Sequence, residues 1–291
     1  MRRRLRRGYV LVVTLALLVL AATLMVLVGR ATLRRAGAAR EAADDLQRRW
    51  GATSCRLAVM PAIESVLVDQ QRKLNGPVAV HRARLRLGEQ TFDLVLADEQ
   101  AKANLNVLLD EGDLRTIETR MRETLTGTGI GQRVRLRPGP TIVSTVHAAG
   151  GEGRNTSTAP TTRPLLPQRV TGFGQIFDDV PPSQLIDASD WVTCWGNGLV
   201  NARRAPPAAL KLATSLSGVE IAALLRLREG PTPGGLLKSA NIRPRPGLHL
   251  AEGSACHSLW IVARSRRREW HYFSVLDESD ERSPAVVSFV W

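Results

Sequence analysis

Cysteine is scarce in this sequence, and the three cysteines lie far apart. Cys55, Cys194 and Cys256 include no CxxC pair, which excludes a zinc knuckle or a thioredoxin-like redox motif by spacing. Two interpretations of these residues remain open. They could form one disulfide in an oxidising compartment, or they could be small buried side chains.

Recognisable catalytic patterns are also lacking. The five histidines are scattered, and the sequence contains neither an HExxH zinc motif nor a nucleophile elbow. Cys256-His257 comes closest to a ligand pair, but ordinary packing explains it as well. The glycine-rich stretch 126–131 follows no strand and ends in no Lys-Ser/Thr pair, so it does not fit a phosphate-binding loop. The sequence therefore predicts a non-enzymatic protein with no assignable catalytic, metal or cofactor site.

Acidic residues are too few to balance the basic ones: 27 against 40, a formal net charge of +13. Such an excess usually indicates nucleic acid or a phospholipid surface as partner. Five arginines, however, fall within the first seven residues. Elsewhere arginines mix with acids or alternate along predicted strands, so no nucleic-acid surface is expected. The length of 291 residues, 44% of them hydrophobic, suits one or two folded domains.

Charge is completely absent from residues 9–28. At about 1.5 Å per residue, a helix of this length spans roughly 30 Å, the hydrocarbon thickness of a bilayer. The arginine-rich start predicts a cytoplasmic N-terminus, with the remaining chain across the membrane. A cleaved secretory signal is the alternative, but its best cleavage site, 36–38, lies beyond three further arginines.

The junction Arg6-Arg7-Gly8-Tyr9 is more specific than a plain anchor. A basic leader that ends in glycine before an unbroken apolar helix resembles the leader of type IV prepilin-like proteins. The resemblance implies that prepilin peptidase cuts between Gly8 and Tyr9 and methylates the new N-terminus. A degenerate leader on an ordinary membrane anchor is the other interpretation.

Counting from Tyr9, the fifth residue is Val13, where most pilins carry glutamate. That glutamate is thought to pair with the N-terminal ammonium of a neighbouring subunit, since an unpaired charge in hydrocarbon is costly. The K-type minor pseudopilin of type II secretion, which lies at the filament tip, lacks this glutamate. Val13 thus resembles the K-type pattern.

Residues 29–75 predict an amphipathic continuation of the helix, and Pro61 should kink or end it. Its apolar positions recur mostly every three or four residues: Leu33, Ala36, Ala39, Ala43, Leu46, Trp50, Leu57, Met60 and Ile63. The period then changes to two. Arg82, Arg84 and Arg86 alternate with Ala83, Leu85 and Leu87, residues 88–89 turn the chain, and Phe92, Leu94 and Leu96 alternate again. This predicts a β-hairpin whose arginines form a solvated face.

Two short motifs carry the family resemblance further. Asp and Asn favour turns and helix caps, and Asp98, Glu99, Lys102, Asn104 and Asn106 also match, in order, a segment of K-type pseudopilins. A second landmark is matched by Asn201, Ala205 and Pro206, with a helix expected after it. Arg203 replaces the second asparagine of that landmark, so no capping or cation role is assigned there.

The middle of the chain predicts helices and one long loop. Leu114, Ile117, Met121 and Leu125 share one helical face, with Asp110 as the expected cap. Residues 137–168, rich in Pro, Gly, Thr and Ser, are expected to form a flexible loop. Residues 216–228, with a helix expected at 221–228, are similar to a helix-hairpin-helix DNA module, but Glu220 stands where a glycine should expose amides to phosphate. The C-terminus predicts strands at 259–263, 270–276 and 286–291, with a basic turn at 266–268.

Together these patterns predict an α+β fold: a long N-terminal transmembrane and amphipathic helix, then a pilin-like antiparallel sheet interrupted by an inserted helical domain. The expected divisions are leader 1–8, transmembrane helix 9–28, amphipathic helix 29–75, sheet domain 76–100 and 240–291, and helical insertion 101–239.

The resemblance to K-type pseudopilins implies a subunit of the inner membrane and periplasm that caps and helps initiate a short filament. Its implied partners are the I- and J-type minor pseudopilins, the inner-membrane assembly platform and prepilin peptidase, and no nucleic acid. Some relatives bind calcium in the helical domain, but no matching ligand set can be assigned. The alternatives are a membrane-anchored DNA-binding protein or a generic single-pass scaffold.

Overall fold

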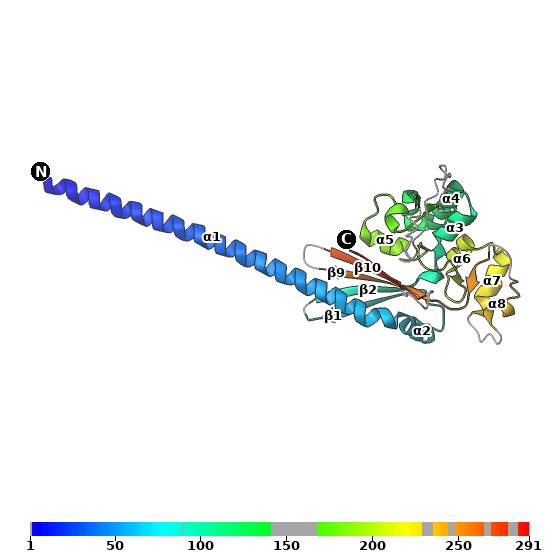
Figure 1. Cartoon of the computed structure of the whole chain (residues 1–291). Coiled ribbons are helices and arrows are strands. Elements are labelled where there is room, and N and C mark those ends of the chain that lie inside the picture. Colours follow the sequence, from blue (N-terminus) through cyan, green and yellow to red (C-terminus); the bar gives the residue numbers. More distant parts are fainter. Residues whose placement is uncertain are drawn as a thin grey trace, which may run out of the picture. The chain divides into compact units, whose positions relative to one another are not determined.

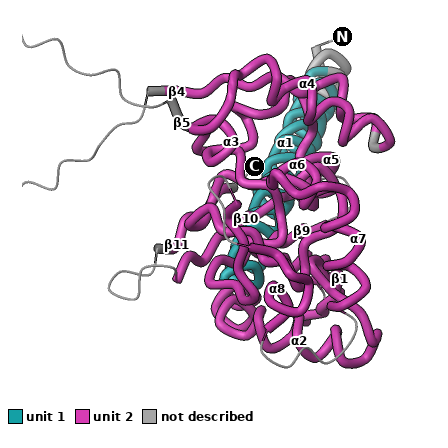
Figure 2. Tube along the Cα trace, turned by 90° about the vertical axis from the view of Figure 1, so that its right-hand side faces the viewer, with its two compact units in different colours: residues 1–53 teal, residues 54–291 magenta. Residues whose placement is uncertain are grey.

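The computed structural model describes residues 2–88, 90–140, 168–228, 235–243, 248–264, 269–278 and 285–290. The side chains of 2–8, 128, 140, 168, 169, 285 and 290 are not described. The chain divides into two compact units, residues 1–53 and 54–291 (Figure 2). The described ranges exclude most of the predicted loop 137–168 and all of the predicted basic turn 266–268.

One continuous helix, α1 (Arg2–Val59), begins the chain. Every residue from Tyr9 to Val28 is exposed, although the segment is apolar on all sides. Its two hydroxyls are satisfied within the helix: Thr14 Oγ1 donates to the Leu11 carbonyl at 2.9 Å and Thr23 Oγ1 to the Leu20 carbonyl at 2.8 Å. By length and composition, this is the one helix of the described chain that is able to cross a membrane.

The predicted interruption at Pro61 is confirmed. Because proline has no backbone N–H and its ring clashes with the preceding turn, α1 stops at Val59 and the 3-10 turn η1 (Met60–Ala62) follows. A second helix, α2 (Ile63–Leu74), ends at Asn75, which has a left-handed φ of 49° and donates its N–H to the Gln71 carbonyl. The helical segment thus ends at Leu74.

The main sheet has five antiparallel strands in the order β1-β2-β9-β10-β11 (Figure 1). Their bounds are β1 Val80–Leu87, β2 Gln90–Asp98, β9 Cys256–Arg264, β10 Glu269–Asp277 and β11 Ala285–Val290. The β1–β2 hairpin has the predicted register, with Leu85 opposite Phe92, and Gly88 supplies a positive φ of 61° at its turn. The three C-terminal strands are likewise confirmed.

The sheet is interrupted as predicted, because β2 and β9 are hydrogen-bonded neighbours although the whole middle of the chain separates them. The inserted elements gather beside one end of these strands (Figure 1). They are η2 Glu99–Ala101, β3 Ala103–Asn104, α3 Leu105–Glu111, α4 Leu114–Leu125, η3 Thr126–Thr128, η4 Gly131–Arg133, β4 Gly139–Pro140, β5 Gln168–Arg169, η5 Phe173–Gln175, α5 Pro182–Ala188, β6 Val192–Thr193, β7 Val200–Asn201, α6 Pro207–Ala213, α7 Gly218–Leu227, α8 Leu236–Ser239 and β8 Leu250–Ala251. Short ladders β3–β6, β4–β5 and β7–β8 tie this insertion together.

An aromatic cluster joins the insertion to the sheet. Phe173 of η5 lies 5.1 Å from Trp195 and 5.9 Å from Trp260 of β9, measured between ring centroids. Trp260 lies 4.5 Å from Phe273 of β10. Aromatic pairs at these separations add to the hydrophobic free energy of burial. Sheet and insertion therefore share one core. The expected division into a sheet domain, 76–100 and 240–291, and a helical insertion, 101–239, remains a prediction.

Two local predictions need correction. Asp113, not Asp110, caps α4: its carboxylate accepts the N–H of Thr116 at 3.3 Å, while Asp110 lies within the preceding helix α3. The predicted buried face of α4 is correct, with Ile117, Met121 and Leu125 buried. Helix α7 begins at Gly218 and not at Ile221, because the Ser217 side chain caps it one turn earlier.

Candidate functional site: a polar network at the junction of sheet and insertion

The motif residues Asp98, Glu99, Lys102 and Asn104 are almost completely buried at the point where the chain leaves β2. Two of them act as the predicted caps. The Asp98 carboxylate accepts the N–H of Ala101 at 3.1 Å, which ends β2 and starts η2. The Asn104 side chain accepts the N–H of Asn106 at 3.0 Å and starts α3. Because these caps satisfy backbone donors inside the protein, they fix the exit from the sheet.

Glu99 forms a buried ion pair with Lys102, and both side chains are 0% exposed. The carboxylate also accepts hydrogen bonds from the hydroxyls of Ser258 in β9 and Thr193 in β6, the latter at 2.5 Å. A buried charge is tolerated only when it is paired and hydrogen-bonded. Glu99 has both, and its partners come from the sheet and from the insertion.

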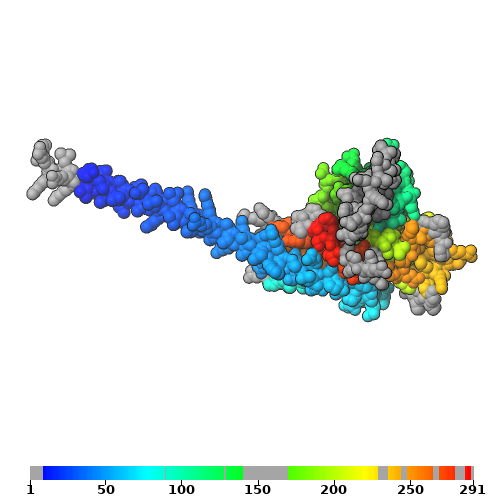
Figure 3. All heavy atoms as spheres, in the orientation of Figure 1, coloured from blue at the N-terminus to red at the C-terminus, as the bar shows by residue number. Residues whose placement is uncertain are grey.

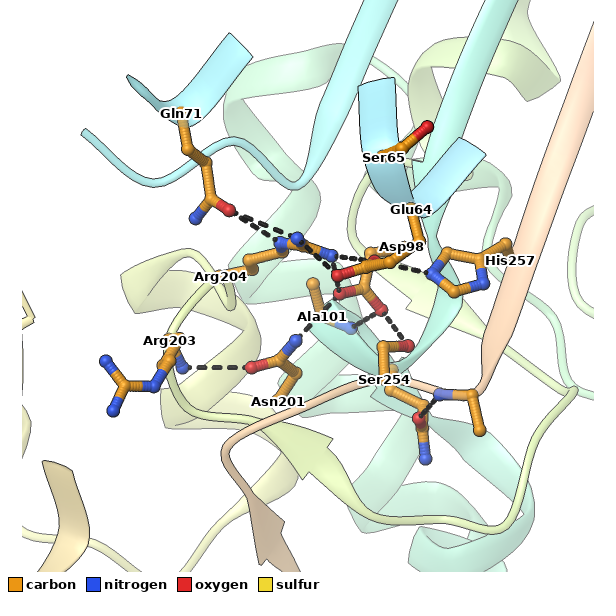
Figure 4. A network of polar contacts seen from close by, with 12 residues as sticks. Glu64, Ser65, Gln71, Asp98, Ala101, Asn201, Arg203, Arg204, Ser254 and His257 are labelled. Atoms are coloured by element: carbon orange, nitrogen blue, oxygen red, sulfur yellow. Dashed lines mark hydrogen bonds and ion pairs between the residues drawn. The ribbon is translucent and has the colours of Figure 1, made fainter. Parts of the chain in front are cut away.

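Asp98 occupies the centre of the network shown in Figure 4. Besides its capping bond, it accepts hydrogen bonds from Ser254 Oγ at 2.6 Å, Asn201 Nδ2 at 2.8 Å and Arg204 Nη1 at 3.3 Å. Its side chain is 0% exposed. The end of β2, the loop before β9 and the β7–α6 segment thus converge on one carboxylate.

Arg204 extends the network to α2. Its guanidinium donates to both oxygens of Glu64, at 2.5 and 2.8 Å, and to Gln71 Oε1 at 3.1 and 3.2 Å. The Arg204 side chain is only 4% exposed, whereas Glu64 remains 47% exposed. Burial alone would lower the pKa of Arg204, but its hydrogen bond with Glu64 and the charges of Asp98 and Glu64 raise it. The arginine is therefore held in its charged form.

Glu64 also lies 3.0 Å from His257 Nε2 of β9. This hydrogen bond, followed by those of Arg204, lowers the pKa of Glu64 to about 2 even though partial burial opposes the shift. The ionised carboxylate therefore links three elements that are distant in sequence: helix α2, strand β9 and the segment before α6.

Two asparagines of the motif form hydrogen bonds that connect separate segments of the insertion. Asn106 Nδ2 donates to the carbonyls of Val170 and Cys194, each at 3.0 Å, and Asn106 Oδ1 accepts the Val170 N–H at 2.8 Å. Asn104 Nδ2 donates to the Trp195 carbonyl at 2.9 Å. Their amides therefore replace backbone ladder bonds where the chain is irregular.

The second landmark meets the first at Asp98. Asn201, at the end of β7, donates to that carboxylate and accepts the Arg203 N–H at 3.1 Å. Ala205 is fully buried, and Pro206 immediately precedes α6, the helix expected there. Arg203 does not replace its missing asparagine in the network, since its side chain turns away to Glu252, 2.8 Å distant.

No group of three or more His, Cys, Asp or Glu side chains in the described chain is arranged to hold a metal ion. The network's carboxylates already face Arg204 and Lys102, so they do not fit a calcium site, which needs several unpaired oxygen ligands. Calcium binding stays a prediction without a ligand set. Cys55, Cys194 and Cys256 are all buried and unbridged, which agrees with the packing interpretation.

A separate groove of about 550 Å³ lies between the sheet and α5. Basic and acidic side chains alternate across the four strands beneath it. Ion pairs join Arg84 Nε to Asp93 Oδ1 at 2.6 Å, Arg264 Nη1 to Asp93 Oδ2 at 3.4 Å, and Arg264 Nε to Glu269 Oε1 at 3.1 Å. Each arginine of this ladder therefore has an acidic neighbour. The arginines of β1 form the predicted solvated face.

The helix-hairpin-helix interpretation conflicts with the start of α7. Glu220 Oε2 accepts the Ser217 N–H at 2.7 Å, and Ser217 Oγ accepts the Glu220 N–H at 3.3 Å. This is a complete capping box. The Glu220 carboxylate accepts the backbone N–H that a phosphate would need, and its negative charge also repels a phosphate.

No family model and no curated protein sequence matches this chain. Among solved structures, one similar chain belongs to the GspK-GspI-GspJ complex of the type 2 secretion system of enterotoxigenic Escherichia coli. The similarity covers 87% of this chain and 98% of that chain, with 12% sequence identity and a TM-score of 0.47.

The sequence predicts the first half of the network and not the second. All of the motif residues from Asp98 to Asn106 lie at the junction, and Asn201 joins them there. No sequence motif predicts Glu64, Arg204 and His257 as partners, because each stands alone in its own segment. The Arg203-Arg204 pair before Ala205-Pro206 was the available signal: two charges beside a buried turn require partners.

Gly8, Tyr9 and Val13 lie within α1, far along the chain from this network. Tyr9 is 71% and Val13 38% exposed. Helical backbone runs through the predicted cleavage junction, and the side chains before Tyr9 are outside the described residues. Cleavage and methylation there stay predictions.

Proposed function

We propose that this protein is a non-enzymatic K-type minor pseudopilin, which caps and helps initiate the periplasmic pseudopilus of a type II protein secretion system. The observation that carries the proposal is the position of the family-like motif. Asp98, Glu99, Lys102 and Asn104 are buried where a pilin-like sheet is interrupted by a large insertion. In this proposal, the motif serves to hold the insertion on the sheet and carries out no reaction.

The proposed role follows from the two ends of the molecule. The apolar part of α1 would remain in the inner membrane, with the N-terminus in the cytoplasm and residues after 28 in the periplasm. Val13 would leave this subunit without the charge that pairs with a subunit ahead of it. The bulk of the insertion would then crown the filament, since no neighbour could stack above it.

The amphipathic part of α1 is the proposed surface for bundling. Leu33, Leu46 and Trp50 are 75%, 57% and 65% exposed. Exposed apolar side chains repeated along a helix favour packing against other helices. The proposed partners there are the I- and J-type minor pseudopilins, with the assembly platform and prepilin peptidase acting at the membrane.

Mass spectrometry of the N-terminus of the mature protein tests the class. We expect a chain that begins at methylated Tyr9 when prepilin peptidase is present and at Met1 when it is absent. A Gly8→Ala variant should remain unprocessed. A start near Ala39 would instead indicate signal cleavage, and an unmodified Met1 in the presence of the peptidase would indicate a plain anchor.

Co-purification tests the K-type assignment. The full chain, extracted in detergent, is expected to form a stoichiometric complex with I- and J-type pseudopilins of the same secretion system. A matched preparation of the major pseudopilin serves as the control for non-specific helix association. A processed, methylated chain that binds the major subunit equally well would belong to the class without being its tip.

A further inference from the structure

The outer edge strand of the main sheet carries no charged residue. Arg56 of α1 donates to its Ser288 Oγ at 3.1 Å, which is a contact with a side chain and not with the backbone edge. Strand β11 contains only Ala, Val, Ser and Phe, in a chain with a net charge of +13. Val286 and Val287 are 56% and 40% exposed, and the red atoms of this strand lie at the surface in Figure 3. Natural proteins usually protect such an edge with charged residues, proline or a covering element. β11 itself has no charged residue or proline, and the described residues place no further strand on its outer side.

The opposite edge of the sheet differs. Strand β1 carries Arg82, Arg84 and Arg86, and Arg82 forms ion pairs with Asp187 and Asp190, each at 3.0 Å. Charges on an edge strand disfavour pairing with another strand, because they would have to be desolvated. The two edges are therefore unequal, and only β11 is suited to accept a further strand.

The inner side of β11 is held in place. It pairs with β10 from Tyr272 opposite Val290 to Asp277 opposite Ala285. Phe289 packs against the aromatic cluster, with ring centroids 6.2 Å from both Phe273 and Trp195. A strand fixed on one side and bare on the other is preorganised, which reduces the entropic cost of binding.

The exposed side chains of β11 also restrict which kind of partner segment could bind along this edge. Val286 and Val287 are adjacent, so they point to opposite faces of the sheet. A helix or loop packed on one face would cover only one of them, and it would leave the outward backbone N–H and C=O groups of the edge unpaired. An extended strand pairs with those groups and places side chains beside both valines.

We propose that β11 is the docking site for an edge strand of a partner pseudopilin, which would extend the five-stranded sheet across the subunit boundary. This inference rests on the proposed function for the identity of the partner. The expected partner strand is uncharged and rich in β-branched or aromatic residues, to match the valines of β11.

Thiol labelling of the full chain in detergent tests this site. Cys55, Cys194 and Cys256 are 1%, 7% and 0% exposed and should not react with a water-soluble maleimide while the chain is folded. A Val286→Cys variant provides one reactive thiol on the edge. Val219→Cys is the matched control, because Val219 is 80% exposed and lies on α7. In the complex with I- and J-type pseudopilins, the labelling rate at position 286 should fall by about tenfold or more, and the rate at 219 should not change.

Backbone amide exchange separates strand addition from other contacts. Exchange at 285–290 should slow on complex formation if a strand pairs there, whereas a helix laid over the valines would protect side chains and leave the outward amides exchanging. A Val287→Lys variant should weaken the complex by about tenfold, and Val219→Lys should not.

The outcomes distinguish the two proposals. A complex of the Val286→Cys variant in which the introduced thiol still labels at the free rate overturns the docking site and leaves the proposed function intact. Protection of that thiol in the isolated variant, with a doubled mass, would assign the edge to a second copy and overturn the partner assignment. Absence of any complex with I- and J-type pseudopilins, while the introduced thiol stays reactive, overturns the proposed function and the partner strand together.

Discussion

Arg204 follows Glu64 by 140 residues, yet its guanidinium donates to both oxygens of the Glu64 carboxylate. The same arginine reaches Asp98, 106 residues before it. Planar, two-point pairing of this kind is specific to arginine, because its donors form a rigid fork that matches a carboxylate. The pair joins α2 to the insertion, so it determines how the end of the N-terminal helical segment is attached to the rest of the unit.

Replacement of Arg204 should destabilise the protein strongly. Arg204→Ala leaves the buried carboxylate of Asp98 without its cation, and loss of one partner of a buried pair typically costs about 3–5 kcal/mol. Guanidinium unfolding of the full chain in detergent, followed by tryptophan fluorescence, measures the change. Arg203→Ala is the matched control, since the Arg203 side chain is 38% exposed and its ion pair with Glu252 is partly open to solvent. Its cost should stay below about 1 kcal/mol.

Stability should fall in acid through Glu64. Its pKa is about 2 in the folded protein against an ordinary value of 4.5. The unfolded chain therefore binds more protons between these values, so the stabilisation is complete above pH 4.5 and is lost as the pH falls toward 2. Unfolding midpoints measured from pH 7 to pH 2 should converge for the wild type and Glu64→Gln at the acid end. A constant difference across that range would contradict the assignment.

Glu99 and Lys102 should behave as one unit. Lys102→Met leaves a fully buried carboxylate unpaired and should cost about 3–5 kcal/mol, whereas the double variant Glu99→Gln with Lys102→Met should recover much of this loss. Unfolding free energies of the wild type, both single variants and the double variant give the coupling. Simple additivity would mean that Ser258 and Thr193, and not Lys102, stabilise the Glu99 charge.

The cysteines should react only after unfolding. All three are buried, and burial raises the pKa of the Cys194 and Cys256 thiols, so little thiolate is present at neutral pH. Without reductant, a thiol reagent should modify none of them in the native chain and all three in guanidinium. Only one reactive thiol under denaturing conditions would show that two of them form a disulfide.

The capping box of α7 should contribute a modest, local stabilisation. Ser217→Ala removes the acceptor for the Glu220 N–H and should cost about 0.5–2 kcal/mol, and Ser217→Asp should restore most of it.

The segment 216–228 also allows a test of the DNA-binding alternative. If Glu220→Gly produced a salt-dependent affinity for duplex DNA that the wild type lacks, the segment would be a suppressed nucleic-acid module. We expect no such affinity.

Local elements were predictable where short-range rules decide them. Pro61 removes a helical N–H wherever it stands, so the end of α1 could be placed from the sequence. The hairpin 80–98 follows from strict alternation around Gly88, whose positive φ favours glycine. The cap of α4 was misplaced by three residues, because Asp110 and Asp113 are equally good caps and only the packing of α3 selects between them.

The sequence by itself determined the apolar helix of residues 9–28, the two-residue period of the strands and the turn chemistry of Asp98 and Asn104, because these depend on neighbouring residues and on solvent. Only the tertiary structure decided that β2 and β9 are neighbours, that Arg204 and His257 meet at Glu64, and that β11 is the last strand of the sheet in the described part of the chain. Those relationships join residues that are far apart in the chain, and the free energy that selects them comes from burying apolar side chains in a shared core in which the buried charges have partners.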